Sequence, residues 1–276
     1  MQIDKYSVLV IGAGHSGIEA ATAAARRGAP TAMFTTDYDN IGQMSCNPAI
    51  GGLAKGQIAL EVDAMGGIMG RAAEEAGLQF RTLNKSKGPA VQAPRAQCDR
   101  ALYKRATKRR VEQQDRLSIK QDKVNKILTD DASVTGLVTA SGTEYLADTV
   151  VVCTGTFLRG TIHLGESGRE GGRAGEAATT KLAQSLDEFE FERGRLKTGT
   201  PPRIDGRTVN YDVMDEQHGE DPPPRFSFYG DTEPVNHKPC WLTATNDRTH
   251  ETIQANLDRS PIYGTGVIDG TGVRYC

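Results

Sequence analysis

The sequence predicts an α/β protein built around a Rossmann-like parallel sheet, on the strength of three observations. An apolar stretch over residues 6–11 ends in glycine, which is typical of a buried parallel strand. A glycine-rich segment over 12–17 follows, and an Ala-rich helix is expected over 18–27. A second apolar strand over 31–35 then completes a strand–helix–strand unit of the kind that builds parallel sheets.

The glycine-rich segment predicts a dinucleotide site. It reads Gly12, Ala13, Gly14, His15, Ser16 and Gly17. In such a turn the first glycine permits the tight bend, the second lets backbone approach a pyrophosphate, and the third lets helix pack on strand. The helix N-terminus adds free N–H groups for the phosphates. The acid that usually binds the ribose is absent at Thr35 and Thr36, which leaves Asp37 or a threonine hydroxyl for that role.

Further elements follow from periodicity and turn residues. Helices are expected over 57–65, 100–114 and 180–186, and strands over 118–121, 134–140, 143–147 and 149–153, with a loop over 42–56. The late strands and the glycine turn over 150–156 look like the returning strand of two-dinucleotide flavoproteins. We therefore expect a glutathione-reductase-like, FAD-binding domain with an inserted second domain, here truncated.

The composition changes near residue 200, where Pro, His and Asp rise and apolar periodicity fades. We therefore assign residues 1–200 to the first part of the FAD-binding domain. Residues 201–276 form a second segment, which the family resemblance described below implies is the start of an inserted NAD(H)-binding or substrate domain. The chain stops at Cys276 without a closing helix or polar tail, which suggests a fragment.

The overall composition fits a globular protein in a reducing cytoplasm. The formal net charge of −2 provides no whole-chain attraction for nucleic acid. No secretory or transit signal and no membrane-spanning run is evident, and the five cysteines are widely spaced without a Cys-x-x-Cys pair. A basic run is compatible with phosphate contact or with a solvated helix face; it comprises Arg95, Arg100, Lys104, Arg105, Lys108, Arg109 and Arg110. His237 and Cys240 lack a second ligand pair, so no metal site is expected.

Cys46 occupies the most unusual stretch, a loop of small residues just ahead of a predicted helix and near Lys55. Both features favour the thiolate. A thiolate beside a flavin can act as a nucleophile or a redox partner. Chemistry alone leaves the alternative, a small buried residue, equally open.

Several blocks of sequence resemble one family. They lie over 42–56, 61–67, 83–91, 171–175, 194–203 and 256–261, with Arg274, Tyr275 and Cys276 at the end. In order, they closely resemble the MnmG (GidA) family, the large flavoprotein subunit of the enzyme that modifies the wobble uridine of tRNA. The resemblance covers the whole chain but only about the first half of the family's usual length. Val273 stands where the family usually has proline.

The resemblance implies an FAD enzyme that uses NADH and methylenetetrahydrofolate, with a GTPase partner, to add an aminomethyl or carboxymethylaminomethyl group to C5 of the wobble uridine. It also implies a homodimer that joins the GTPase subunit in a heterotetramer. By motif, Cys46 and Cys276 are catalytic. The residues expected to contact FAD are Gly12, Ala13, Gly14, His15, Ser16, Gly17, Val124 and Thr179, and those expected to contact NAD are Gly272, Val273, Arg274 and Tyr275.

Two rival interpretations remain. The folate-dependent tRNA uracil methyltransferases share the fold and the reductive one-carbon logic, although we do not expect them to carry the block around Cys46. The other rival is a non-catalytic fragment that binds only a cofactor or a partner.

Overall fold

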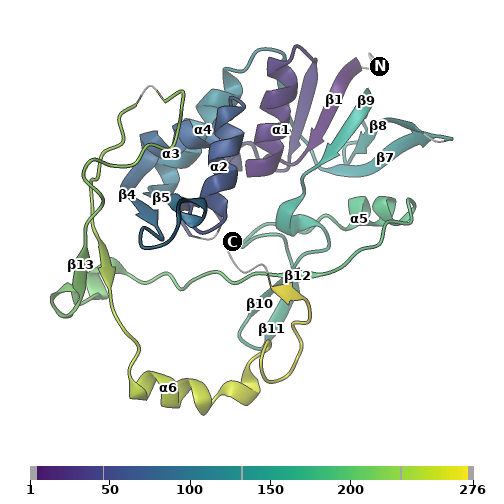
Figure 1. Ribbon diagram of the computed structural model, residues 1–276. Coiled ribbons are helices and arrows are strands. Elements are labelled where there is room, and N and C mark those ends of the chain that lie inside the picture. Colours follow the sequence, from purple (N-terminus) through teal and green to yellow (C-terminus); the bar gives the residue numbers. More distant parts are fainter. Residues whose placement is uncertain (1–4, 46, 132, 231, 273–276) are drawn as a thin grey trace.

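The structure is a computed structural model that describes residues 5–45, 47–131, 133–230 and 232–272. Its centre is a six-stranded sheet in the order β6-β2-β1-β9-β8-β7 (Figure 1). Four strands are parallel: β1 (Lys5–Ile11), β2 (Thr31–Thr35), β6 (Leu117–Gln121) and β9 (Glu144–Val152). The antiparallel strands β7 (Val124–Asp130) and β8 (Ser133–Thr139) extend the sheet beyond β9. The predicted Rossmann-like α/β fold is confirmed.

Alternating residues of the central strands supply two separate hydrophobic cores. Leu9 and Phe34 face a core that includes Leu182 of α5 (Thr180–Asp187) and residues of β7 and β8. Val10 and Met33 face the opposite core, which includes residues of α1 (His15–Arg26) and α4 (Arg100–Glu112). All four strand side chains are almost fully buried. Each such burial stabilises the fold by about 1.5–3 kcal/mol, so both faces hold the sheet rigidly below its carboxyl edge.

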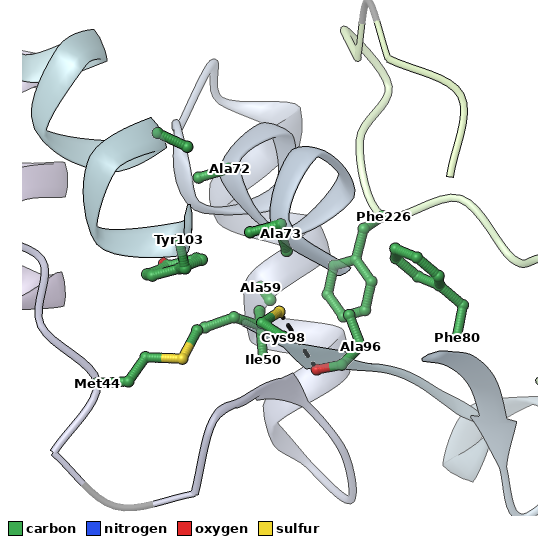
Figure 2. Close-up of a cluster of buried hydrophobic side chains, with 12 residues drawn as sticks. Met44, Ile50, Ala59, Ala72, Ala73, Phe80, Ala96, Cys98, Tyr103 and Phe226 are labelled. Atoms are coloured by element: carbon green, nitrogen blue, oxygen red, sulfur yellow. Dashed lines mark hydrogen bonds between the residues drawn. The ribbon is translucent and has the colours of Figure 1, made fainter. Parts of the chain in front are cut away.

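A smaller unit lies beside this sheet. The strands β3 (Ala49–Gly51), β5 (Ala93–Cys98) and β4 (Gly77–Leu83) form an antiparallel sheet in that order. The helices α2 (Lys55–Ala64) and α3 (Met69–Ala76) pack on it, and α4 closes the side toward the large sheet (Figure 1). Alanines at the centre of this core leave room for aromatic rings, as Figure 2 shows with Phe80, Tyr103 and Phe226.

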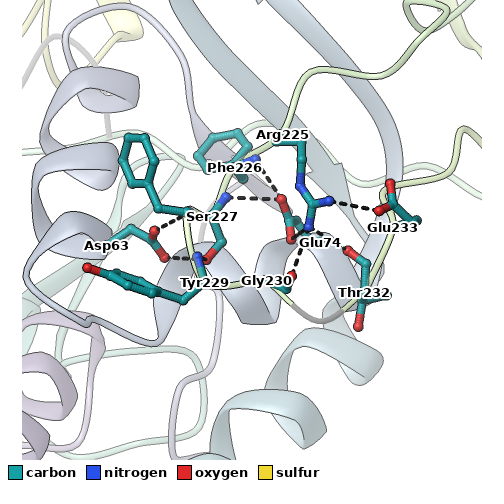
Figure 3. A network of polar contacts seen from close by, with 10 residues as sticks. Asp63, Glu74, Arg225, Phe226, Ser227, Tyr229, Gly230, Thr232 and Glu233 are labelled. Carbon is teal, nitrogen blue, oxygen red and sulfur yellow. Dashed lines mark hydrogen bonds and ion pairs between the residues drawn. The ribbon is translucent and has the colours of Figure 1, made fainter.

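A segment beyond residue 200 shares that core. Phe226 is fully buried there. The carboxylate of Glu74 on α3 accepts hydrogen bonds from the backbone N–H groups of Phe226 at 2.8 Å and Ser227 at 3.0 Å. Asp63 on α2 accepts from the Ser227 hydroxyl and from the N–H of Phe228, both at 2.7 Å (Figure 3). Two buried carboxylates therefore fasten this segment to the helices that follow the Cys46 loop.

The remaining elements are short. They comprise the hairpin β10 (Thr161–Leu164) and β11 (Ser167–Glu170), the pair β12 (Leu196–Lys197) and β15 (Thr271–Gly272), the pair β13 (Asp215–Gln217) and β14 (Cys240–Leu242), and helix α6 (Asp247–Gln254). Single 3-10 turns lie at Tyr38–Asn40, Pro89–Val91, Gly155–Phe157, Gly206–Thr208, Tyr211–Val213 and Leu257–Arg259. α6 buries none of its residues, so little packing fixes it to the rest.

Several expected boundaries need correction. The two strands expected over 143–147 and 149–153 are one strand, β9. β7 was not expected, because a register shift after Val124 places Val124 and Ile127, three residues apart, in the core and breaks the alternation typical of strands. The helix after the glycine segment begins at His15 and not at residue 18. Helix α3 and strands β4 and β5 were also not expected.

Candidate functional site

The glycine loop joins β1 to α1 at the carboxyl edge of the parallel strands, where ligands bind in open α/β sheets. Gly12 has a φ of 107°, and a Cβ atom there would overlap the carbonyl of Cys153 at the end of β9. A Cβ atom at Gly17 would overlap the carbonyl of Gly12. The N–H of Cys153 donates to the Ile11 carbonyl at 2.8 Å, so the returning strand lies beside the first glycine loop as expected.

Gly14 differs from its two neighbours. It is exposed, has an ordinary φ of −80°, and has no heavy atom within 4 Å of the position of an added Cβ. It is also the N-cap of α1, and no side chain caps the helix there. The first N–H groups of α1 therefore face an open approach, which is the arrangement that binds a dinucleotide pyrophosphate.

The carboxyl edge of β2 carries the candidates for ribose binding. The Thr35 hydroxyl donates to the Asp37 carbonyl at 2.9 Å, and the Asp37 carboxylate accepts from the Asp39 N–H at 2.8 Å. Asn40 also donates to that carboxylate, at 2.5 Å, and reaches Glu176 at 3.5 Å. The Thr35 hydroxyl and the Asp37 carboxylate are thus both held by hydrogen bonds within their own loop, and ribose binding by either stays a prediction.

Val124 and Thr179 are brought close to this edge. Val124 begins β7 and is almost fully buried, so a contact with a ligand must come from its backbone. Lys123, which precedes Val124, donates to the carbonyl of Ala178, which precedes Thr179, at 2.7 Å; this hydrogen bond joins the two segments. The Thr179 hydroxyl is buried and has no hydrogen-bond partner among the described residues. Since buried hydroxyls rarely lack a partner, this one fits a bound cofactor.

The loop that contains Cys46 is tied to the glycine loop on its near side. The N–H of Gly42 donates to the Ala13 carbonyl at 3.0 Å, and Met44 is buried in the smaller core. Arg173 lies 3.5 Å from the Ser45 hydroxyl and pairs with Glu176 through two hydrogen bonds of 2.6 and 2.9 Å. Cys46 itself lies outside the described residues.

The expected NAD-contacting segment is only partly described. Gly272 ends β15 and pairs with Lys197 of β12, apart from the six-stranded sheet. The side chains at the end of this segment lie outside the described residues; they are Val273, Arg274, Tyr275 and Cys276.

Two of the described thiols are poor nucleophiles. Burial raises the pKa of the Cys98 thiol to about 12, and burial also raises the pKa of Cys153. A thiol with a raised pKa stays protonated at neutral pH and is unreactive. Neither can replace Cys46 or Cys276 as the expected reactive cysteine.

The basic run lies largely on α4 and partly pairs with acids. Lys108 contacts Asp39 at 2.9 Å, while Arg109 and Arg110 contact Glu75 at 2.7 and 2.8 Å. These three charges are partly neutralised, which favours a solvated helix face at these positions.

In the described part of the chain, no cluster of three or more His, Cys, Asp or Glu side chains could hold a metal. No described helix has the length and hydropathy needed to cross a bilayer.

Sequence reasoning missed two features near the glycine loop. One is the bridge from Asn40 through Glu176 to Arg173, which joins positions 136 apart in the chain. The other is a buried polar cluster of His15, Tyr103 and Thr107. Local spacing could not predict the long-range part of either feature, because Asn40 meets Glu176, and His15 meets α4, only in the folded chain.

Comparisons with known proteins point to one family. The family model described as glucose inhibited division protein A matches residues 7–276. A structure of Aquifex aeolicus GidA in its form I crystal is 48% identical, with a TM-score of 0.91, and the match covers 99% of this chain and 46% of that one. The form II structure is also 48% identical, with a TM-score of 0.86, and covers 93% of this chain and 44% of that one.

A more distant structure shares the fold. The GidA-related protein from Thermus thermophilus is 23% identical, with a TM-score of 0.50, over 69% of this chain and 71% of that one. The chain thus spans less than half the length of the two Aquifex structures.

Proposed function

The chain belongs to the glucose inhibited division protein A family, and on that premise we propose that it is part of an FAD-dependent enzyme that modifies the wobble uridine of tRNA. The main observation in support of FAD binding is the open Gly14 at the uncapped start of α1. The orphaned Thr179 hydroxyl at the same edge of the sheet supports it. The tRNA substrate rests on the family.

We propose the remaining reactants and partners from the family resemblance. NADH would reduce the flavin, and methylenetetrahydrofolate would supply the carbon that becomes attached to C5 of uracil. A GTPase subunit would complete the enzyme as a heterotetramer around a homodimer, in the cytoplasm. Bound FAD would supply reversible two-electron chemistry next to the uracil ring.

The residues of this chain would then bind and orient FAD and would supply thiol groups to the uracil ring. The N–H groups at the start of α1 would hold the pyrophosphate, while Gly12 and Gly17 keep that turn in place by close backbone packing. Cys46 and Cys276 would supply thiol chemistry. Uracil C5 is a poor nucleophile until a group adds at C6, and a thiolate is suited to that addition or to a proton transfer.

Replacing Gly14 with valine tests the FAD site. No protein atom obstructs the new side chain and its φ is ordinary, so the fold should persist. The branched side chain should instead occupy the space of the pyrophosphate. We expect a folded Gly14→Val protein that purifies without flavin. Circular dichroism reports the fold, and absorbance at roughly 450 nm reports oxidised flavin.

Gly88 provides the control, because it also has an ordinary φ and no heavy atom within 4 Å of an added Cβ, yet lies far along the chain from the loop. Gly88→Val should remain yellow. A folded Gly14→Val protein with a full complement of flavin would refute the proposed site.

The NADH site is tested at Arg274. A guanidinium binds phosphate through paired hydrogen bonds, so its loss should weaken the dinucleotide reductant and leave FAD bound. We expect Arg274→Ala to reduce its flavin with NADH about 10- to 100-fold less efficiently in stopped-flow absorbance, the loss expected for one or two charged hydrogen bonds. Unchanged kinetics with normal flavin content would place the nicotinamide site elsewhere.

A further inference from the structure

Three buried polar atoms gather beneath the glycine loop. They are Nε2 of His15, the hydroxyl oxygen of Tyr103 and Oγ1 of Thr107; none completes a well-aligned hydrogen bond among the described residues, although the Tyr103 and Thr107 hydroxyls interact with each other. All three side chains line one narrow crevice between α1 and α4. Tyr103 is completely buried and Thr107 nearly so. Buried polar atoms are almost always paired, so three of them at one crevice require an explanation.

A bound water does not supply it. The crevice has no space large enough for a water molecule, and its other walls are mainly apolar, with Ile18, Ile68 and Met69 among them. Glu19 also borders the crevice, but its carboxylate already accepts the N–H groups of Ile68 at 3.0 Å and Met69 at 2.8 Å. Pairing among the three atoms is the explanation that the crevice itself supplies.

Their chemistry is complementary. A neutral imidazole offers one acceptor nitrogen, a phenol is both donor and acceptor, and so is a threonine hydroxyl. The His15 and Tyr103 rings meet edge to face, with centroids 5.6 Å apart. Burial lowers the pKa of His15, which favours the neutral ring that can accept a proton at Nε2. In a complete chain Thr107 would donate to Tyr103, whose hydroxyl already interacts with it, and Tyr103 would donate to His15.

The crevice also connects the parts of the candidate site. His15 is the first residue of α1 and follows Gly14 directly, so its side chain anchors the turn whose N–H groups face the phosphates. Thr107 lies against Gly42, where an added Cβ would come within 2.6 Å of its methyl carbon. Gly42 in turn donates to Ala13 of the glycine loop.

We propose that Tyr103 and Thr107 are positioning residues that act through a hydrogen-bonded chain onto His15 and so orient the glycine loop for FAD. This inference rests on the proposed FAD function. Formation of the chain would fix the first turn of α1 at the orientation that binds the pyrophosphate, so part of the affinity for FAD would come from α4, a helix that need not touch the cofactor.

The test measures FAD affinity in the complete protein by flavin fluorescence after removal and return of the cofactor. Tyr103→Phe and Thr107→Val keep size while removing one hydroxyl each. Each should weaken FAD binding about tenfold, the ratio expected for one hydrogen bond. Thr22→Val is the control, because its hydroxyl is buried in α1 but bonds the Ile18 carbonyl at 2.9 Å and does not line the crevice.

A double-mutant cycle separates positioning from mere stability. If Tyr103 acts through His15, Tyr103→Phe should cost no further affinity in a His15→Leu background, whereas a general loss of packing would add to it. The same cycle with Thr107→Val serves if Tyr103→Phe does not fold. Affinities equal to that of Thr22→Val, or fully additive losses, would overturn the inference while wild-type flavin binding stands. A wild-type protein that binds no FAD would instead overturn the proposed function.

Discussion

Serine at Cys46, and separately at Cys276, is expected to abolish tRNA modification while the fold and the flavin content stay normal. A hydroxyl is close in size to a thiol but is far less ionised and less nucleophilic at neutral pH. If either cysteine acts as a nucleophile or a proton donor, modification should fall to below about 1% of the wild-type level, a loss typical of removing a reacting group. If both only fill space, serine should cost mainly stability.

The measurement is made in cells that lack the enzyme. Each variant is expressed in the full-length protein, the tRNA is digested, and the modified wobble nucleoside is quantified by mass spectrometry. Cys98→Ser is the control, since burial raises the pKa of the Cys98 thiol to about 12 and the side chain lies within the smaller core. Normal modification by both Cys46→Ser and Cys276→Ser would remove the catalytic assignment and leave the flavin site as the supported chemistry.

Much of the central sheet could be predicted because its signals are local. The strand β2 lies at the expected bounds, and the glycine spacing before α1 indicated distinct roles for Gly12, Gly14 and Gly17 that their surroundings support. Backbone collisions at the first and third glycines and open space at the second are consequences of a turn that the spacing alone specifies.

The smaller unit could not be predicted as well, because its burial comes from contacts distant in sequence. β4 carries polar residues such as Gln79 and Arg81, which make hydrogen bonds to the carbonyls of Gln217 and His218. Its side chains therefore do not show the alternation of a half-buried strand. Glu74 gives a helix such as α3 a polar appearance, although its side chain is fully buried. Only the folded chain shows the partners that make these polar groups compatible with burial.

The candidate site shows the same division. The residues of the glycine loop are neighbours in sequence, so their spacing predicts the turn. Thr179, by contrast, reaches the carboxyl edge of the sheet because Lys123 holds the carbonyl of Ala178, a contact across 55 positions. Its placement by family resemblance stays a prediction of cofactor contact, now with an unpartnered hydroxyl in its favour.

Replacing the buried Glu74 with alanine is expected to cause a large loss of stability in the smaller unit. Its carboxylate is fully buried and holds two backbone N–H groups, at Phe226 and Ser227, with Arg225 at 3.4 Å (Figure 3). Alanine would leave these donors without an acceptor inside the protein. Breaking a buried charged network in this way costs about 3–5 kcal/mol.

The neighbouring Glu75 offers a matched control on the same helix. Its carboxylate pairs with Arg109 and Arg110 at a partly exposed position, so Glu75→Ala should cost no more than about 1 kcal/mol. Glu74→Gln should fall between the two, because an amide oxygen can still accept the backbone N–H groups but carries no charge for Arg225. Thermal unfolding should therefore rank the midpoints Glu75→Ala, Glu74→Gln, Glu74→Ala in descending order.

Hydrogen exchange locates the effect. In Glu74→Ala the amides of Phe226 and Ser227 should lose protection, whereas those of β1 and β2 should keep theirs, because the described residues of the two cores around the central strands all precede residue 190. That result would show that Glu74 is one of the carboxylates that hold residues 226–228 to the smaller unit, alongside Asp63. Equal unfolding midpoints for Glu74→Ala and Glu75→Ala would show that the buried Phe226 and the contacts of Asp63 hold this stretch without Glu74.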